Sequence, residues 1–179
     1  MELKLIGDKG AAPGEFKEPC GVAVAPDGRI VVADTWNQRI QILSAAGDPI
    51  DEWHAGLYGP RGVAVDATGG IWVTDTGNRR VLGWRGSTLP EPGRPADILL
   101  GQDDAAQRGD NRGEGVGAMS FRWPHAVAGD ERTLYIADAG DHLQRAGRAA
   151  RREARAEHGL PLGHELALLP DERARLVAK

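Results

Sequence analysis

The sequence predicts an all-β fold, an incomplete β-propeller of about three blades, each a four-stranded antiparallel sheet, with a helical or disordered C-terminal tail. Three observations predict it. A unit recurs after 41 residues, glycine and proline are abundant (25 and 11 of 179 residues), and short apolar runs alternate with turn residues. Four short strands in about 40 residues are typical of one propeller blade.

The first copy of the unit occupies residues 16–57. Pro19 cannot donate a hydrogen bond to a β-ladder, so it marks the entry to the first strand. Asp27 and Gly28 predict a hairpin turn, because glycine and aspartate tolerate the positive φ that such turns require. The four strands are expected at residues 21–24, 30–33, 39–43 and 49–54.

The second copy occupies residues 58–118 and includes an insertion, and a third, partial copy occupies residues 119–141. They begin at Pro60 and Pro124, which match Pro19. Their small-residue first strands are expected to pack closely near a common axis. Strands are expected at residues 62–65, 71–74, 80–84 and 96–101 in the second copy and 126–128 and 134–137 in the third. Residues 1–15 are expected to supply the outer strand of a preceding blade.

The marked positions resemble the NHL repeat. The motifs are Pro-x-Gly-Val-Ala-Val, Asp-Gly-x-Ile-x-Val-Ala-Asp and Asn-x-Arg-Ile/Val, and the resemblance covers residues 16–141. It implies a propeller of about six blades, of which this chain supplies two complete blades and parts of two more. We therefore expect a propeller fragment, an assembly completed by other chains, or a marginally stable arc. Self-association would cover the open blades.

The repeat pattern breaks after Asp138. Residues 141–144 replace the Asn-x-Arg motif, and we expect no apolar third strand there. The Ala/Arg-rich residues 143–157 favour a helix, and a second helix is expected near Pro170. Residues 142–179 form either a helical appendage or the product of a frameshift or truncation, and the abrupt change within a motif favours the second explanation.

Three aspartates occupy equivalent positions at the ends of the second strands. The repetition favours a structural role, in which the carboxylate caps backbone amides of the following turn. Arg39 and Arg80 each follow an aspartate by five residues and are expected to pair with it. No catalytic residue is therefore expected. The aspartates are Asp34, Asp75 and Asp138.

A metal site is not expected. Cys20, Arg61 and His125 each follow a strand-initial proline and are expected near the mouth of the central channel. A related lyase family places metal-binding histidines at comparable positions, but Cys20 and His125 would supply only two ligands. One cysteine also excludes an internal disulfide framework. We expect no cofactor.

Aromatic and basic side chains are expected to gather on one loop face of the propeller. The turn after the first aspartate and the loops before the prolines share that face, and exposed aromatic and arginine side chains are typical of recognition surfaces. The alternative is that the aromatics fill gaps between blades. The candidate binding residues are Trp36, Tyr58, Arg61, Arg122, Trp123 and His125.

These observations predict a non-enzymatic binding or scaffold module that contacts a protein or a small ligand. The alternative is a fragment of a metal-dependent propeller enzyme of the lyase or lactonase type, and RNA binding is third. Residues 1–141 hold 14 Lys and Arg against 21 Asp and Glu, so nucleic acid is not an expected partner. No apolar run approaches about 18 residues and no secretory signal is evident, so we expect no membrane partner and a cytoplasmic location.

Overall fold

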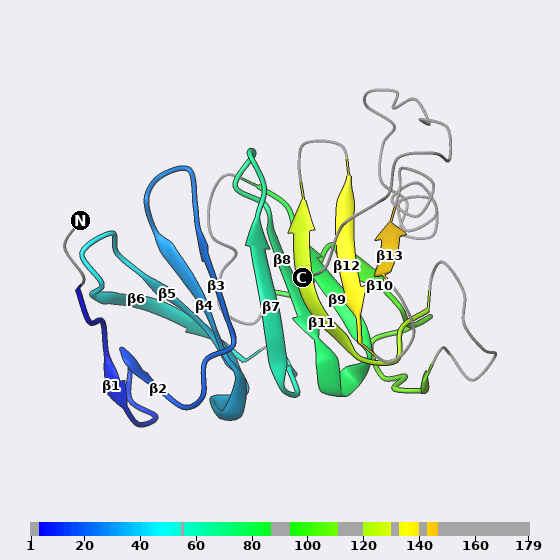
Figure 1. Ribbon diagram of the computed structural model, residues 1–179, viewed down its shortest axis with the longest axis horizontal. Coiled ribbons are helices and arrows are strands. Elements are labelled where there is room, and N and C mark those ends of the chain that lie inside the picture. Colours follow the sequence, from blue (N-terminus) through cyan, green and yellow to red (C-terminus); the bar gives the residue numbers. More distant parts are fainter. Residues whose placement is uncertain are drawn as a thin grey trace.

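The structure is a computed structural model that describes residues 4–54, 56–86, 94–110, 120–129, 133–139 and 143–146. Figure 1 shows three antiparallel sheets side by side in chain order, and we call them blades 1, 2 and 3. Their first strands lie next to one another. This arrangement is the arc of a β-propeller, as the sequence predicted.

Blades 1 and 2 are four-stranded and blade 3 has three described strands, each blade in simple meander order. Blade 1 consists of β3 (Gly21–Val24), β4 (Ile30–Asp34), β5 (Arg39–Leu43) and β6 (Pro49–Trp53). Blade 2 consists of β7 (Pro60–Val65), β8 (Ile71–Asp75), β9 (Arg80–Trp84) and β10 (Ile98–Leu100). Blade 3 consists of β11 (Pro124–Gly129), β12 (Leu134–Asp138) and β13 (Leu143–Ala146). One-turn 3-10 helices, η1 (Thr35–Asn37) and η2 (Thr76–Asn78), join the second and third strands of blades 1 and 2.

Hairpin turns and 3-10 turns lie at opposite ends of the blades (Figure 1). Gly28 and Gly69 take φ values of 87° and 84° in the hairpin turns, which a residue with a Cβ adopts only with strain. The 3-10 turns end at Gln38 and Arg79, both in the left-handed region. The two kinds of turn therefore give blades 1 and 2 two chemically different ends.

Apolar side chains from adjacent blades form two buried clusters. Between blades 1 and 2, Trp53 and Trp84 meet with ring centroids 5.5 Å apart. Between blades 2 and 3, Trp72 packs with Leu134 and Ile136. Blade 2 therefore buries both of its faces, and this apolar burial is the main stabilising term of the arc.

One valine of each first strand shows how the blades stack. Val22, Val63 and Val127 pair with Val32, Val73 and Ile136 in equivalent registers. Val63 and Val127 are 7% and 8% exposed because they face the preceding blade, whereas Val22 is 67% exposed. No blade precedes blade 1 in the described part of the chain. Its open face borders a groove of about 280 Å³.

Close contact at the innermost strands depends on glycine. A Cβ on Gly21 would overlap the carbonyl oxygen of Arg61 in blade 2. A Cβ on Gly62 would lie 2.9 Å from the carbonyl oxygen of His125 in blade 3. The predicted close packing near the axis is thus confirmed, and Ala126 takes the equivalent position in blade 3.

Two expectations about the ends of the arc were wrong. Residues 4–7 form no strand, and β1 (Asp8–Lys9) instead pairs in parallel with β2 (Glu15–Phe16). A third strand follows Asp138 where a helix was expected from residue 143, because β13, which reads Leu-Gln-Arg-Ala, pairs antiparallel with β12. The backbone pairing of β12 thus continues blade 3 into a segment whose composition favours a helix.

Residues 147–179 lie outside the described residues, so the predicted helices there stay predictions, as do the domain boundaries and the frameshift hypothesis. In the part of the chain that is described, no helix has the length and apolar character needed to cross a bilayer.

Candidate binding face

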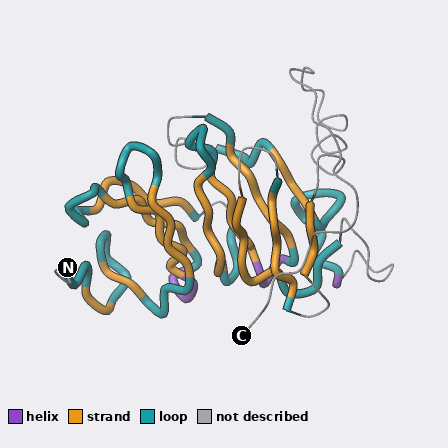
Figure 2. Tube along the Cα trace, turned by 45° about the horizontal axis from the view of Figure 1, so that its top comes forward, coloured by secondary structure: helices purple, strands orange, loops and turns teal. Residues whose placement is uncertain are grey.

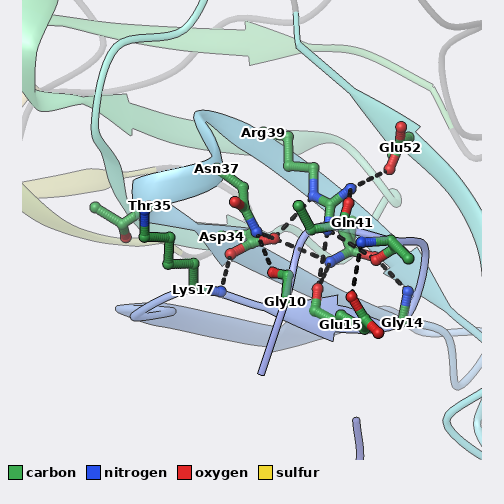
Figure 3. Close-up of polar contacts among 12 residues, drawn as sticks. Gly10, Gly14, Glu15, Lys17, Asp34, Thr35, Asn37, Arg39, Gln41 and Glu52 are labelled. Atoms are coloured by element: carbon green, nitrogen blue, oxygen red, sulfur yellow. Dashed lines mark hydrogen bonds and ion pairs between the residues drawn. The ribbon is translucent and has the colours of Figure 1, made fainter. Parts of the chain in front are cut away.

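A buried carboxylate organises the end of blade 1 that carries η1. Asp34 Oδ1 accepts a hydrogen bond from the Lys17 amide at 2.8 Å (Figure 3). Its Oδ2 accepts from Asn37 Nδ2 at 2.9 Å, Arg39 Nε at 2.8 Å and Gln41 Nε2 at 3.0 Å. Asp34 and Arg39 are both buried, so the ion pair is shielded from water.

Blade 2 repeats this network. Asp75 accepts hydrogen bonds from the Tyr58 amide at 2.7 Å, Asn78 Nδ2 at 2.8 Å and Arg80 Nε at 2.7 Å. Burial raises the pKa of Asp75, while the hydrogen bonds from Asn78 and Tyr58 and the charge of Arg80 oppose that rise. The aspartate therefore depends on these partners to remain charged inside the protein.

Among its described residues, blade 3 shows part of the network. Asp138 accepts hydrogen bonds from the amides of Arg122 at 2.9 Å and Trp123 at 2.6 Å. In all three blades the aspartate thus fixes the loop that enters the first strand.

The expected pairing of the aspartates with arginines is confirmed in blades 1 and 2. The expected capping of backbone amides is wrong, because Asp34 and Asp75 do not cap the 3-10 turns that follow them and accept only the side-chain amides of Asn37 and Asn78 from those turns. The amides come instead from the preceding loop, 17 residues earlier in the chain. The sequence contains no local signal for that partner.

A threonine beside the aspartate links each blade to the next. Thr35 Oγ1 donates to the carbonyl oxygen of Pro60 at 2.7 Å, and Thr76 Oγ1 donates to that of Pro124 at 2.5 Å. Blade 3 has Ala139 at this position. Sequence reasoning missed these links, although the repeated Asp-Thr pair was the available signal.

The loop face is the end of the arc formed by η1, η2 and the loops that enter β3, β7 and β11 (Figures 1 and 2). Three aromatic side chains on it are exposed: Trp36 by 59%, Tyr58 by 58% and Trp123 by 52%. Among the described residues, no other aromatic side chain is strongly exposed. Because they are exposed, these side chains do not fill gaps between blades.

The three aromatics occupy equivalent pairs of loops. The Trp36 amide donates to the carbonyl of Lys17, the Gly77 amide to that of Tyr58, and the Ala139 amide to that of Trp123. Each blade therefore presents one aromatic where the loop that enters its first strand meets the turn after its second strand. The aromatic comes from the turn in blade 1 and from the entry loop in blades 2 and 3. The Tyr58 ring lies so close to Gly77 that no side chain fits there.

Basic side chains lie at the blade 2 and blade 3 end of the loop face. Arg122 Nε lies 3.8 Å from Asp110 Oδ2, and Asp110 also pairs with Arg79. Arg61 is half-buried and has no carboxylate within 4 Å among the residues that the structure places. Arg61 lies beside His125, and none of the described carboxylates pairs with it.

His125 reports on that charge. Burial lowers the pKa of its imidazole below the ordinary value, the nearby Arg61 guanidinium lowers it further, and Asp138 raises it. Because the pKa of His125 is lower in the folded protein, the unfolded chain binds its proton first as pH falls. The free energy of unfolding therefore decreases below the pKa that His125 has in the unfolded chain. His125 is therefore a neutral hydrogen-bonding group at pH 7.

Replacing Arg61 with glutamine is expected to raise the pKa of His125, because a neighbouring positive charge is removed. The pKa stays below the ordinary value, since burial is the larger cause and is unchanged. Titration of the imidazole C–H resonances by NMR measures this shift. An unchanged or lower pKa in the variant would contradict the placement of Arg61 beside His125.

Cys20 is exposed and its Sγ lies 3.6 Å from the carbonyl oxygen of Glu18. Across the described ranges, no group of three or more His, Cys, Asp or Glu side chains is arranged to hold a metal ion.

Comparison with known proteins identifies the repeated unit. The NHL repeat matches residues 16–43 and 57–84, so the chain carries NHL repeats folded as propeller blades. B-box type zinc finger protein ncl-1 of Caenorhabditis elegans is 52% identical over 42 residues, which are 24% of this chain and 5% of that protein. The human E3 ubiquitin-protein ligase TRIM32 is 42% identical over 45 residues, 25% of this chain and 7% of that protein. The chain thus matches a small part of each relative.

Solved structures similar to this chain include a luciferin-regenerating enzyme (17% identity, TM-score 0.47) and XC5397, a gluconolactonase from Xanthomonas campestris (17% identity, TM-score 0.44). A streptogramin B lyase is 14% identical with a TM-score of 0.40. The likeness covers 71%, 68% and 73% of this chain and 39%, 35% and 52% of those proteins, respectively.

Proposed function

We propose that this chain is a non-enzymatic binding module whose loop face contacts another protein. The observation that carries the proposal is the row of exposed aromatics, Trp36, Tyr58 and Trp123, with one on each blade at the same junction. Large exposed aromatic side chains cost free energy in water and are enriched where proteins bind one another.

The hydrogen-bonded frame beneath this row supports the proposal. The buried aspartates fix the loops that carry Tyr58 and Trp123, through the amides of these two residues. Trp36 follows Thr35, whose hydroxyl is bonded to blade 2. A surface held in place before binding loses little conformational entropy when a partner docks.

Site-specific photo-crosslinking tests the proposal. The photoreactive residue p-benzoylphenylalanine would replace Trp36, Tyr58 or Trp123 in turn, and Thr68 in a hairpin turn at the opposite end serves as the control. We expect protein adducts at the three aromatic positions, with a yield that falls when the other two aromatics are changed to alanine. Equal yields at Thr68, or yields that ignore the alanine changes, would refute the proposal.

A further inference from the structure

We infer that the loop face binds an extended acidic peptide, which lays apolar side chains along the aromatic row and sets a carboxylate against Arg61. The inference rests on the proposed function and names the chemistry of the partner. Two independent features carry it, namely the continuity of the row and Arg61, which has no carboxylate partner among the described residues.

The aromatic row is continuous from blade to blade. Trp36 follows Thr35, which is bonded to Pro60, and Tyr58 lies two residues before that proline. Tyr58 in turn covers Gly77, which follows the threonine bonded to Pro124, next to Trp123. The three rings are thus joined by direct contacts of their own loops.

The spacing of the row suits an extended chain. Packed sheets lie about 10 Å apart, so neighbouring blades that each carry one aromatic follow one another at about that spacing. An extended peptide advances about 3.3 Å per residue, so every third residue meets a ring. Apolar side chains at positions i, i+3 and i+6 of a peptide would then contact Trp36, Tyr58 and Trp123 in order or in reverse.

The charge of the face favours an acidic partner. Each of the buried arginines Arg39 and Arg80 has a carboxylate partner, whereas half-buried Arg61 has none among the described residues. A guanidinium partly removed from water gains most from a carboxylate that accepts two parallel hydrogen bonds. At the blade 1 end of the row, Lys17 is offset by the adjacent Glu18. The acidic residues of the peptide therefore belong near blades 2 and 3.

A peptide fits these features better than an RNA strand does. A nucleic-acid backbone carries a charge at every nucleotide and needs basic side chains along its whole path. Apart from Lys17, which stands next to Glu18 in the sequence, the basic groups of the loop face lie at its blade 2 and blade 3 end, and the chain as a whole has a net charge of −4. Stacking on the aromatic row is available to both partners, so charge decides between them.

Selection from a displayed library of random dodecapeptides tests the inference. Against the wild-type protein we expect selected peptides enriched in Asp and Glu, with apolar residues three positions apart. The Arg61→Gln variant is expected to bind a selected acidic peptide about tenfold more weakly. Arg29→Gln, which alters an exposed ion pair with Asp27 in a hairpin turn, is the matched control and should bind as the wild type does.

Three results would overturn the inference: selected peptides without acidic enrichment, unchanged affinity in Arg61→Gln, or displacement of the peptide by oligouridine at equal concentration. The Trp36→Ala/Trp123→Ala variant separates this inference from the proposed function. If the double alanine variant loses binding and Arg61→Gln does not, the acidic partner is refuted and the proposed function stands. Full binding in that variant, or failure of the wild type to select any peptide, removes both.

Discussion

Replacing Asp75 with alanine is expected to lower the free energy of unfolding by about 3–5 kcal/mol, because it leaves the buried Arg80 guanidinium without its partner. The change also removes the acceptor for the Tyr58 amide and for Asn78. Urea unfolding followed by tryptophan fluorescence measures the loss. Asp75→Asn keeps the shape and lacks the charge, so it should fall between the wild type and the alanine variant.

Asp27→Ala provides the control for this experiment. Asp27 and Arg29 form an ion pair within one exposed hairpin turn, and exposed ion pairs contribute little to stability. We expect an unfolding midpoint equal to that of the wild type. If Asp75→Ala unfolds at the same urea concentration as Asp27→Ala, the buried aspartate network does not stabilise the fold.

Replacing Gly62 with alanine is expected to lower the free energy of unfolding by about 1–3 kcal/mol. The added Cβ would lie 2.8 Å from the Cα of Ala126 and 2.9 Å from the amide nitrogen of Val127. These are backbone atoms, so the strain cannot be relieved by a side-chain rotation, and blades 2 and 3 must separate. Thermal unfolding by circular dichroism measures the effect.

Ala126→Val tests the same position on blade 3. Ala126 is exposed, and the described residues place no blade on the side of β11 that faces away from blade 2. We therefore expect a melting temperature close to that of the wild type. Equal losses in Gly62→Ala and Ala126→Val would show that the glycine acts within its own strand and not at the contact between blades.

The strands of blades 1 and 2 were predictable because their signals are local. Residues 21–24 were predicted as a strand and form β3 with the same bounds, since an apolar run after a proline and before an Asp-Gly turn specifies a strand. The salt bridge of Arg39 with Asp34 was equally accessible, because both residues flank one turn. Short-range chemistry that repeats in each copy is what a sequence displays.

Contacts between blades were not predictable in the same way. Thr35 and Thr76 bond to prolines 25 and 48 residues further along the chain, and the intervening length differs because of the insertion. The strand β13 was missed for a related reason. Its composition favours a helix, and its conformation follows from pairing with β12, a tertiary effect that outweighs intrinsic propensity.

Of the loop face, the residue types and their common end were predicted, but their environment was not. The low pKa of His125 depends on burial and on Arg61 in the neighbouring blade, neither of which a strand pattern reports. The exposure of Trp36 and Trp123 likewise follows from how the loops pair, through hydrogen bonds that join residues 15 or more positions apart.

Hydrogen–deuterium exchange with and without a selected acidic peptide tests most directly whether the aromatic row is the binding surface. The account predicts slower exchange of the Trp36, Gly77 and Ala139 amides, which close the three loop pairs. It predicts no change in the hairpin turns at residues 27–29 and 66–70. Slower exchange in those turns or along β3, with the loop pairs unchanged, would contradict it.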